Sequence, residues 1–212
     1  MNIKVLIADD HAVMREGLKT LIETGAAASV VAAVANGREA LQATLRLNPD
    51  VVVMDISMPD LNGIEAARLI RERCPATQIV ILSMYSDREQ VHRAFNAGAI
   101  GYVLKEAASD EVLAAIRAAA GGRRYLSTAL DERSIARDAT PGPSPLASLS
   151  ARERQVLQLV VEGKSSAEIA GIVHLSPKTV ETYRSRLMKK LGVADVTALV
   201  KFAVLHGITG IG

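Results

Sequence analysis

Short apolar runs alternate with helical patterns over the first 120 residues, and this alternation limits the fold more than any other feature of the chain. The runs contain few polar residues, as expected of strands that are buried on both faces of a sheet. Between the runs, apolar residues such as Leu18 and Ile22 recur at the spacing of one helix face. Five strands that alternate with five helices predict a doubly wound parallel sheet. The runs lie at residues 3–8, 29–35, 51–55, 78–84 and 100–104.

The pattern changes after this region and becomes entirely helical toward the end of the chain. Residues 126–137 allow a short helix, and residues 138–147 contain three prolines, a composition typical of a linker. Beyond the linker, Ser150 and Glu153 have the spacing of a capping box, which marks the start of a helix. We therefore expect an α/β domain, a linker and a domain of four helices, at residues 1–121, 122–147 and 148–212.

The third of these four helices has the clearest boundaries. Ser176 is suited to cap its start, Pro177 to be its first residue, and Gly192 to follow its end. Asp195 is suited to cap the fourth helix.

The net charge of +2 hides an uneven distribution. Residues 146–212 contain nine lysines and arginines against five acidic residues, whereas the residues before them are slightly acidic. A basic excess confined to one domain favours nucleic acid as a partner of that domain.

Cysteine content and hydropathy indicate the compartment. The single cysteine, Cys74, excludes an internal disulfide and fits a reducing environment. The first residues lack the basic start and long apolar core of a signal peptide. No apolar stretch approaches the ~20 residues that cross a bilayer. We therefore expect a cytoplasmic protein with no membrane partner.

Polar residues end four of the five apolar runs. They are Asp9, Asp10, Asp55, Ser83 and Lys105. Because ligands bind beyond the carboxyl ends of parallel strands, the fold would bring these side chains to one edge of the sheet. Crowded carboxylates favour a hard divalent cation such as Mg²⁺. A carboxylate is also a competent nucleophile toward phosphorus, and a lysine and a hydroxyl could stabilise the phosphoryl oxygens.

These residues lie within motifs that resemble the receiver domain of two-component response regulators, which has a flavodoxin-like fold. The matching motifs are DDH at 9–11, DISMPDLNG at 55–63, LSMYSD at 82–87 and GYVLK at 101–105. The resemblance implies that Asp55 is the phosphoacceptor and that Lys105 contacts the phosphoryl group. It implies a switch pair in which Ser83 moves toward the phosphate and Tyr102 swings inward. It also implies a Mg²⁺ site formed by Asp9, Asp10, Asp55 and the backbone carbonyl of Ser57.

The helix expected at residues 177–191 has two different faces. Val180, Tyr183, Leu187 and Leu191 share the face that should pack inward. Polar and basic side chains on such a helix can reach base edges in a major groove and bind phosphates. The candidate DNA contacts are Lys178, Thr179, Glu181, Thr182, Arg184, Ser185, Arg186 and Lys189.

Residues 148–207 resemble the DNA-binding domain of the LuxR/FixJ class of regulators, through the run LSARERQVLQLVVEGKSSAEIAGIVHLSPKTVETYRSRLMKKLGV. The resemblance implies a helix-turn-helix near residues 169–188 with Pro177–Leu191 as its recognition helix. It also implies that the fourth helix, residues 195–206, pairs two domains into a dimer on DNA. Tyr183 stands where many members of the class have histidine.

Glu181 allows two interpretations. Its carboxylate could accept a hydrogen bond from a cytosine amine or select against wrong sites. Alternatively, it could simply pair with Arg184 or Arg186 in the free protein.

Together the two resemblances predict a response regulator that is not an enzyme. A sensor histidine kinase would phosphorylate Asp55, and the helix that contains Val91 and Phe95 would carry the change to the surface. The receiver would then either release the DNA-binding domain or dimerise. Phosphorylation would thus control the binding of duplex DNA, by a homodimer that reads two half-sites, and hence transcription.

Two other classes are less consistent with the sequence. A phosphatase of the haloacid dehalogenase type needs a second aspartate two residues after the nucleophile, where this chain has Ser57. The helical domain could also bind protein or RNA rather than DNA. Recognition of single-stranded RNA usually relies on stacking aromatic residues, which are only 3% of this chain.

Overall fold

The structure is a computed structural model that describes residues 2–25, 28–86, 88–107, 109–130 and 145–205. The chain divides into two compact units, Met1–Ala139 and Thr140–Gly212. Among the described helices, none combines the length and hydropathy that a bilayer crossing requires.

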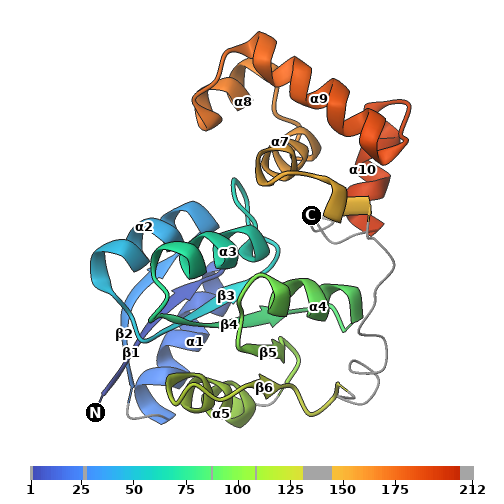
Figure 1. The fold of residues 1–212 in the computed structure, drawn as a ribbon. Coiled ribbons are helices and arrows are strands. Elements are labelled where there is room, and N and C mark those ends of the chain that lie inside the picture. Colours follow the sequence, from blue (N-terminus) through green and yellow to red (C-terminus); the bar gives the residue numbers. More distant parts are fainter. Residues whose placement is uncertain (1, 26–27, 87, 108, 131–144, 206–212) are drawn as a thin grey trace. The chain divides into compact units, whose positions relative to one another are not determined.

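A parallel sheet forms the centre of the first unit (Figure 1). Its strand order is β2-β1-β3-β4-β5-β6, and every neighbouring pair is parallel. The five predicted strands are confirmed, and a sixth, two-residue strand pairs with the edge of β5. The strands are β1 Ile3–Ala8, β2 Ala28–Val34, β3 Val51–Asp55, β4 Gln78–Ser83, β5 Gly101–Leu104 and β6 Tyr125–Leu126.

Five helices cover the two faces of this sheet, as the doubly wound pattern predicts. They are α1 Ala12–Gly25, α2 Gly37–Leu47, α3 Gly63–Arg73, α4 Arg88–Asn96 and α5 Ser109–Ala120. Alternate residues of each central strand face opposite cores. Val52 packs with residues of α2, α3 and α4, whereas Val53 packs with residues of α1 and α5. The uninterrupted apolar runs therefore reflect burial on both faces.

The register of the strands places their carboxyl ends at one edge. Asp55 at the end of β3 lies beside Leu82, and Ser83 at the end of β4 lies beside Leu104. The residues that follow β1 and β5 therefore emerge at the same edge as Asp55 and Ser83.

The prediction of a short helix at residues 126–137 is wrong for its described part. Leu126 belongs to β6, and residues 127–130 form a turn. The open edge of β5 offers backbone hydrogen bonds that residues 125–127 could not form if they were helical. Leu126 pairs there with Tyr102. The rest of that predicted helix, and residues 138–144 of the predicted linker, lie outside the described residues.

The second unit is helical throughout its described part. It comprises the 3₁₀ helix η1 Pro145–Ser148 and the helices α7 Ala151–Val161, α8 Ser166–Val173, α9 Pro177–Leu191 and α10 Val196–Leu205. One core cluster joins them, with Leu157, Ile169, Val180 and Ala203 among its fully or almost fully buried members.

The predicted helix caps of this unit are confirmed. Ser150 and Glu153 form a reciprocal capping box at the start of α7, and Ser176 Oγ accepts a hydrogen bond from the Thr179 N–H. Gly192 follows α9 in the left-handed conformation, with φ +67°, which glycine adopts without strain. Asp195 Oδ1 accepts from the Ala198 N–H and so caps α10.

A second capping box, beyond the predicted one at Ser150, starts α8. Ser165 Oγ accepts from the Glu168 N–H, and the Glu168 carboxylate accepts from the Ser165 N–H at 2.8 Å. The turn between α8 and α9 therefore joins two helices with well-defined starts.

Candidate functional site

The side chains of Asp9, Asp55 and Lys105 converge at the carboxyl edge of the sheet, although they come from three separate strand ends. Lys105 Nζ lies 2.8 Å from Asp9 Oδ2 and 2.7 Å from Asp55 Oδ2. All three side chains are at most 5% exposed, so solvent and salt weaken the interactions between their charges only slightly. The ammonium group offsets part of the repulsion between the two carboxylates.

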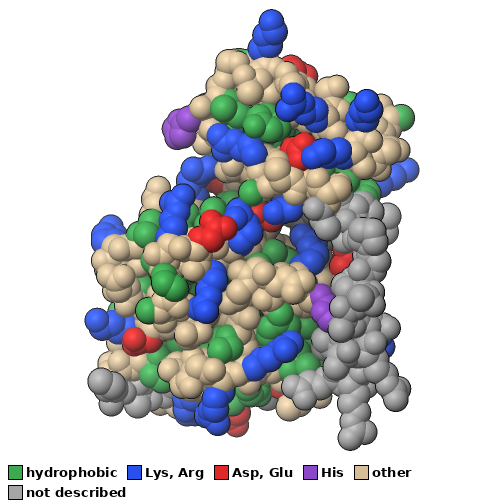
Figure 2. All heavy atoms as spheres, in the orientation of Figure 1, with side chains coloured by type: hydrophobic (Ala, Val, Ile, Leu, Met, Phe, Trp, Pro, Cys, Tyr) green, Lys and Arg blue, Asp and Glu red, His purple; other side chains and the backbone are tan. Residues whose placement is uncertain are grey.

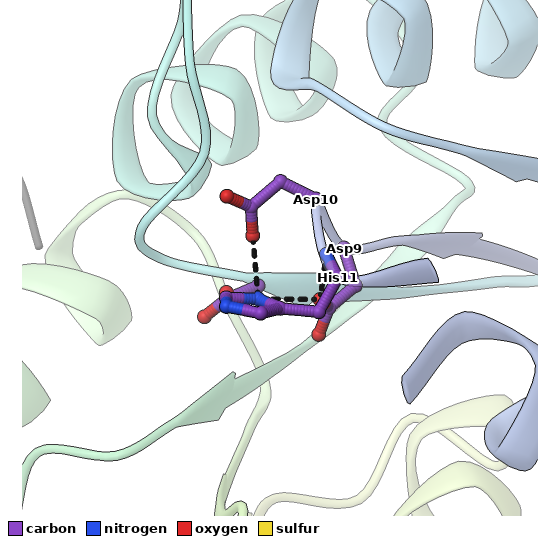
Figure 3. Close-up of side chains that lie close together, drawn as sticks. Asp9, Asp10 and His11 are labelled. Atoms are coloured by element: carbon purple, nitrogen blue, oxygen red, sulfur yellow. Dashed lines mark hydrogen bonds and ion pairs between the residues drawn. The ribbon is translucent and has the colours of Figure 1, made fainter. Parts of the chain in front are cut away.

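The turn after β1 presents the remaining acidic group (Figure 3). Asp10 and His11 are exposed, and His11 Nδ1 lies 2.8 Å from Asp10 Oδ1 and 3.3 Å from Asp9 Oδ1. The backbone of the turn is fixed as well. The His11 N–H donates to Asp9 Oδ1 at 2.8 Å, and Arg15 Nη1 donates to the Asp9 carbonyl at 2.6 Å. The roles of His11 and Arg15 in this turn are not apparent from the sequence.

The charge states of the cluster follow from burial and mutual contact. Burial raises the pKa of Asp55 above its ordinary value, and the neighbouring Lys105 opposes this effect without cancelling it. Burial alone would lower the pKa of Lys105, but Asp55 and Asp9 outweigh it and raise the pKa. The lysine is therefore held in its charged form, and a further cation would favour the ionised form of Asp55.

The donor set fits a divalent cation. Asp9, Asp10, His11 and Asp55 each offer a ligand atom, and these atoms lie within 4.8 Å of one another. Asp9 Oδ2 is buried and, apart from its ion pair with Lys105, has no hydrogen bond of regular geometry to any described residue. Such an oxygen gains from a metal ligand bond. The Ser57 backbone contacts the Asp55 carboxylate through its N–H, and a role of its carbonyl toward a metal stays a prediction.

Two glycines hold the backbone around Asp55. A Cβ atom on Gly63 would lie 1.9 Å from the Asp55 carbonyl oxygen, and one on Gly37 would lie 2.2 Å from the Leu61 carbonyl oxygen. Hydrogen bonds accompany both approaches, from the Gly63 N–H to Ile56 and from the Gly37 N–H to Leu61. The loop that follows β3 therefore needs glycine at position 63 to pack directly onto the strand end that carries Asp55.

The predicted switch pair is connected through Tyr85. Ser83 Oγ accepts a hydrogen bond from the Tyr85 N–H at 3.0 Å, and the Tyr102 hydroxyl donates to the Tyr85 carbonyl at 2.8 Å. Tyr102 is fully buried. The inward position that we expected only after phosphorylation is therefore the one seen here, because the buried hydroxyl has an acceptor inside the fold.

The predicted recognition helix α9 has the expected inward face. Val180 and Leu187 are buried, and Tyr183 and Leu191 pack partly against the same core. Thr179 and Arg184 are half-buried among the candidate DNA contacts. The exposed candidates are Lys178, Glu181, Thr182, Ser185, Arg186 and Lys189. Figure 2 shows lysine and arginine side chains spread over the face of the second unit that is in view.

Glu181 and Arg184 are engaged within the domain. The Ser166 hydroxyl at the start of α8 donates to Glu181 Oε1, and Arg184 Nη1 donates to Ser166 Oγ at 2.9 Å. Arg184 Nη1 also lies 3.7 Å from Glu181 Oε1. Of the two interpretations of Glu181, these contacts favour pairing within the protein.

Comparison with known proteins gives the same division of roles. Residues 5–117 match the response regulator receiver domain family, and residues 147–203 match the family described as bacterial regulatory proteins, luxR family. The transcriptional regulatory protein MctR of Rhizobium johnstonii is 37% identical over 97% of this chain and 95% of its own. The response regulator UvrY of Escherichia coli K12 is 35% identical over 97% of this chain and 95% of its own.

A solved structure extends this likeness to three dimensions. RcsB from Salmonella enterica serovar Typhimurium, bound to promoter P1flhDC in the presence of the phosphomimetic BeF₃⁻, is 27% identical to this chain. The match has a TM-score of 0.65 and covers 95% of this chain and 98% of that one. Response regulators that join these two domains are transcription factors rather than enzymes. The chain therefore belongs to the LuxR family of two-component response regulators, DNA-binding proteins that are controlled by phosphorylation of an aspartate.

Proposed function

We propose that Asp55 is the phosphoacceptor and that a sensor histidine kinase is the phosphoryl donor. The observation that carries this proposal is the contact of Lys105 with both Asp55 and Asp9 in a buried pocket at the sheet edge. A carboxylate oxygen of Asp55 would form the new P–O bond as the P–N bond of the phosphohistidine breaks. The electron pair of that bond would return to the histidine ring.

The residues around Asp55 have separate tasks in this transfer. Lys105 is placed to contact the phosphoryl oxygens while it remains charged. Asp9 and Asp10, with Asp55 and the Ser57 carbonyl, would hold Mg²⁺, which when bound offsets the negative charge of the phosphoryl group. Ser83 would exchange its bond from the Tyr85 N–H for one to a phosphate oxygen, and Tyr102 would respond through Tyr85.

A labelling experiment tests this assignment. Purified protein is incubated with labelled acetyl phosphate and Mg²⁺, and acid-stable label on the protein is measured. Asp55→Asn should abolish incorporation because the amide cannot form the acyl phosphate. Asp50→Asn, which changes a carboxylate at the opposite end of the same strand, should incorporate label as the wild type does. Unchanged incorporation in Asp55→Asn refutes the proposal.

We further propose that α9 reads the major groove of duplex DNA and that α10 pairs two copies of the chain. The exposed cations Lys178, Arg186 and Lys189 would bind phosphates or base edges, together with Thr179, Thr182, Arg184 and Ser185. In this division, residues 1–121 receive the phosphoryl group, residues 122–147 connect, and residues 148–212 bind DNA.

The salt dependence of binding tests the DNA surface. Arg186→Gln should lower duplex affinity and reduce the slope of log K against log salt by about 1 for each bound copy if the side chain contacts one phosphate. Lys19→Gln makes the same charge change at an exposed position on α1 of the first unit and should leave the slope close to that of the wild type. Equal slopes for all three proteins contradict the assignment of α9.

A further inference from the structure

The segment that follows α5 lies along the strand that carries Tyr102. Strand β6 pairs in parallel with β5, with Leu126 beside Tyr102 (Figure 1). The Ser127 N–H then donates to the Tyr102 carbonyl at 2.8 Å. The first residues of the predicted linker are thus hydrogen-bonded to a residue of the switch pair.

Glu111 on α5 fixes this segment from its other side. One carboxylate oxygen accepts from the Ser127 hydroxyl at 2.8 Å, and the other accepts from the Thr128 N–H. Partial burial alone would raise the pKa of Glu111, but the bonds from Thr128, Ser127 and Tyr125 outweigh it and lower the pKa. The carboxylate is therefore ionised at neutral pH, and its bonds to the segment are charge-assisted.

Contacts with α4 and with the core complete the attachment. The guanidinium of Arg124 lies 3.7 Å from the ring centroid of Phe95, at cation–π distance. Leu126 and Leu130 pack against the core cluster that contains Tyr102. Residues 124–130 therefore contact the two elements, α4 and β5, through which we expect the phosphorylation signal to pass.

These bonds form a continuous path from the sheet edge to the linker. The Ser83 hydroxyl bonds to the Tyr85 N–H, and the Tyr85 carbonyl bonds to the Tyr102 hydroxyl. The Tyr102 carbonyl bonds to the Ser127 N–H, and the Ser127 hydroxyl bonds to Glu111. These hydrogen bonds are joined by the covalent frames of Tyr85 and Tyr102, so displacement at Ser83 has a physical route to residue 127.

We propose that Glu111 is a positioning residue that holds residues 125–130 on β5, so that the state of Ser83 and Tyr102 is transmitted to the chain leading to the second unit. This inference rests on the proposed phosphorylation of Asp55. A two-residue edge strand contributes few ladder bonds and is marginal on its own. The bonds from Glu111 therefore decide how fully the segment occupies its place on the sheet. A weakly held edge segment of this kind is suited to the two nearby states that a switch requires.

The test compares Glu111→Gln and Ser127→Ala in the full-length protein with the control Asp110→Asn. The control removes one carboxylate charge from the same turn of α5, and no described residue of 125–130 bonds to it. Three quantities are measured: label incorporated from acetyl phosphate, hydrogen exchange of residues 125–130, and duplex affinity with and without acetyl phosphate. The ratio of the two affinities reports the coupling.

We expect all variants to incorporate label as the wild type does. In Glu111→Gln and Ser127→Ala, exchange of residues 125–130 should rise about tenfold. The affinity ratio should fall by about fivefold or more, within the usual range of allosteric coupling. Asp110→Asn should match the wild type in all three measurements. Ser127→Ala acts on the segment itself, so agreement between the two variants separates the proposed role from misfolding of α5.

Each other outcome counts against the proposal. A raised exchange with an unchanged affinity ratio reduces Glu111 to a structural role. A changed ratio with unchanged exchange shows that Glu111 does not act through this segment. If the wild type incorporates no label, the proposed function fails first, and the inference that rests on it fails with it. If only the variants depart from expectation, phosphorylation of Asp55 stands and the role of Glu111 is refuted.

Discussion

The two capping boxes of the second unit allow a matched test of what an ion pair to a buried carboxylate adds to a helix start. Glu153 is 5% exposed, and its carboxylate accepts from the Ser150 N–H and from Lys190 Nζ, each at 2.7 Å. Lys190 lies on α9 and also donates to the Ser148 carbonyl at 3.1 Å. Glu168 has the same position in its own box but is exposed and bonds to Ser165. Glu153→Gln and Glu168→Gln therefore make the same change in two different surroundings.

The loss of unfolding free energy expected for Glu153→Gln can be estimated from these contacts. A hydrogen bond between charged groups contributes about 1.5–3 kcal/mol. Because Lys190 is 42% exposed, the contribution of its ion pair with Glu153 falls toward the ~1 kcal/mol of a surface pair. Weakening of the capping box adds about 0.5 kcal/mol. We expect a loss of about 1–2 kcal/mol, which corresponds to roughly 4–16 °C in the unfolding temperature of a domain of 60–100 residues.

Hydrogen exchange of the full-length protein measures this loss in the second unit. The opening free energy of amides in α7 and α9 should fall in Glu153→Gln and change much less in Glu168→Gln. Exchange in the first unit should be unaffected in both variants. Equal losses in the two variants would refute the reasoning, because the ion pair to Lys190 would then add nothing to the cap.

The pH dependence of the same comparison follows from the pKa of Glu153. Burial alone would raise this pKa, but Lys190 and Ser150 outweigh it and lower the pKa below its ordinary value. The stabilisation is therefore fully present above the unfolded pKa of about 4.3 and is lost as the pH falls through the lower folded value. The difference between wild type and Glu153→Gln should shrink over that acidic range, and a difference that grows there would contradict the assignment.

Two further predictions concern the phosphorylation site and α9. Gly63→Ala should destabilise the first unit by about 1–3 kcal/mol and slow phosphoryl incorporation, because its Cβ would lie 1.9 Å from the Asp55 carbonyl oxygen. Gly17→Ala, in a helix with nothing within 4 Å of the new Cβ, should instead stabilise slightly in thermal unfolding. Glu181→Gln should raise the affinity for specific and random duplexes alike in fluorescence anisotropy, because it removes a negative charge and the partner of Arg184. A loss confined to one base pair of the specific site would instead mean that Glu181 reads that base.

The sequence predicts the sheet and the carboxyl-edge cluster because both depend on patterns that are visible in one dimension. Strand burial appears as uninterrupted apolar runs, and parallel topology alone brings Asp9, Asp55 and Lys105 to one edge. Capping boxes are equally local, so Ser150 and Glu153 could be identified from their spacing. The box at Ser165 has the same spacing and was within reach of the same argument.

The features that escaped prediction depend on contacts between distant residues. The pairing of β6 requires an open edge of β5, and neither Tyr125 nor Leu126 carries a periodic signal by itself. The inward position of Tyr102 depends on the Tyr85 carbonyl, a backbone group that any residue supplies. The bond between Ser166 and Glu181 joins two helices whose packing the sequence does not specify.

The three core clusters also indicate where the two units of this protein can be separated and fused to other domains. Two of them are built from residues up to Leu130, and the third from residues from Leu146 onward. A fusion point between these two leucines divides none of the three clusters. A receiver with a different input signal can thus be grafted onto this output module without dividing any core cluster of the described residues, which makes the chain a practical starting point for engineered transcriptional sensors.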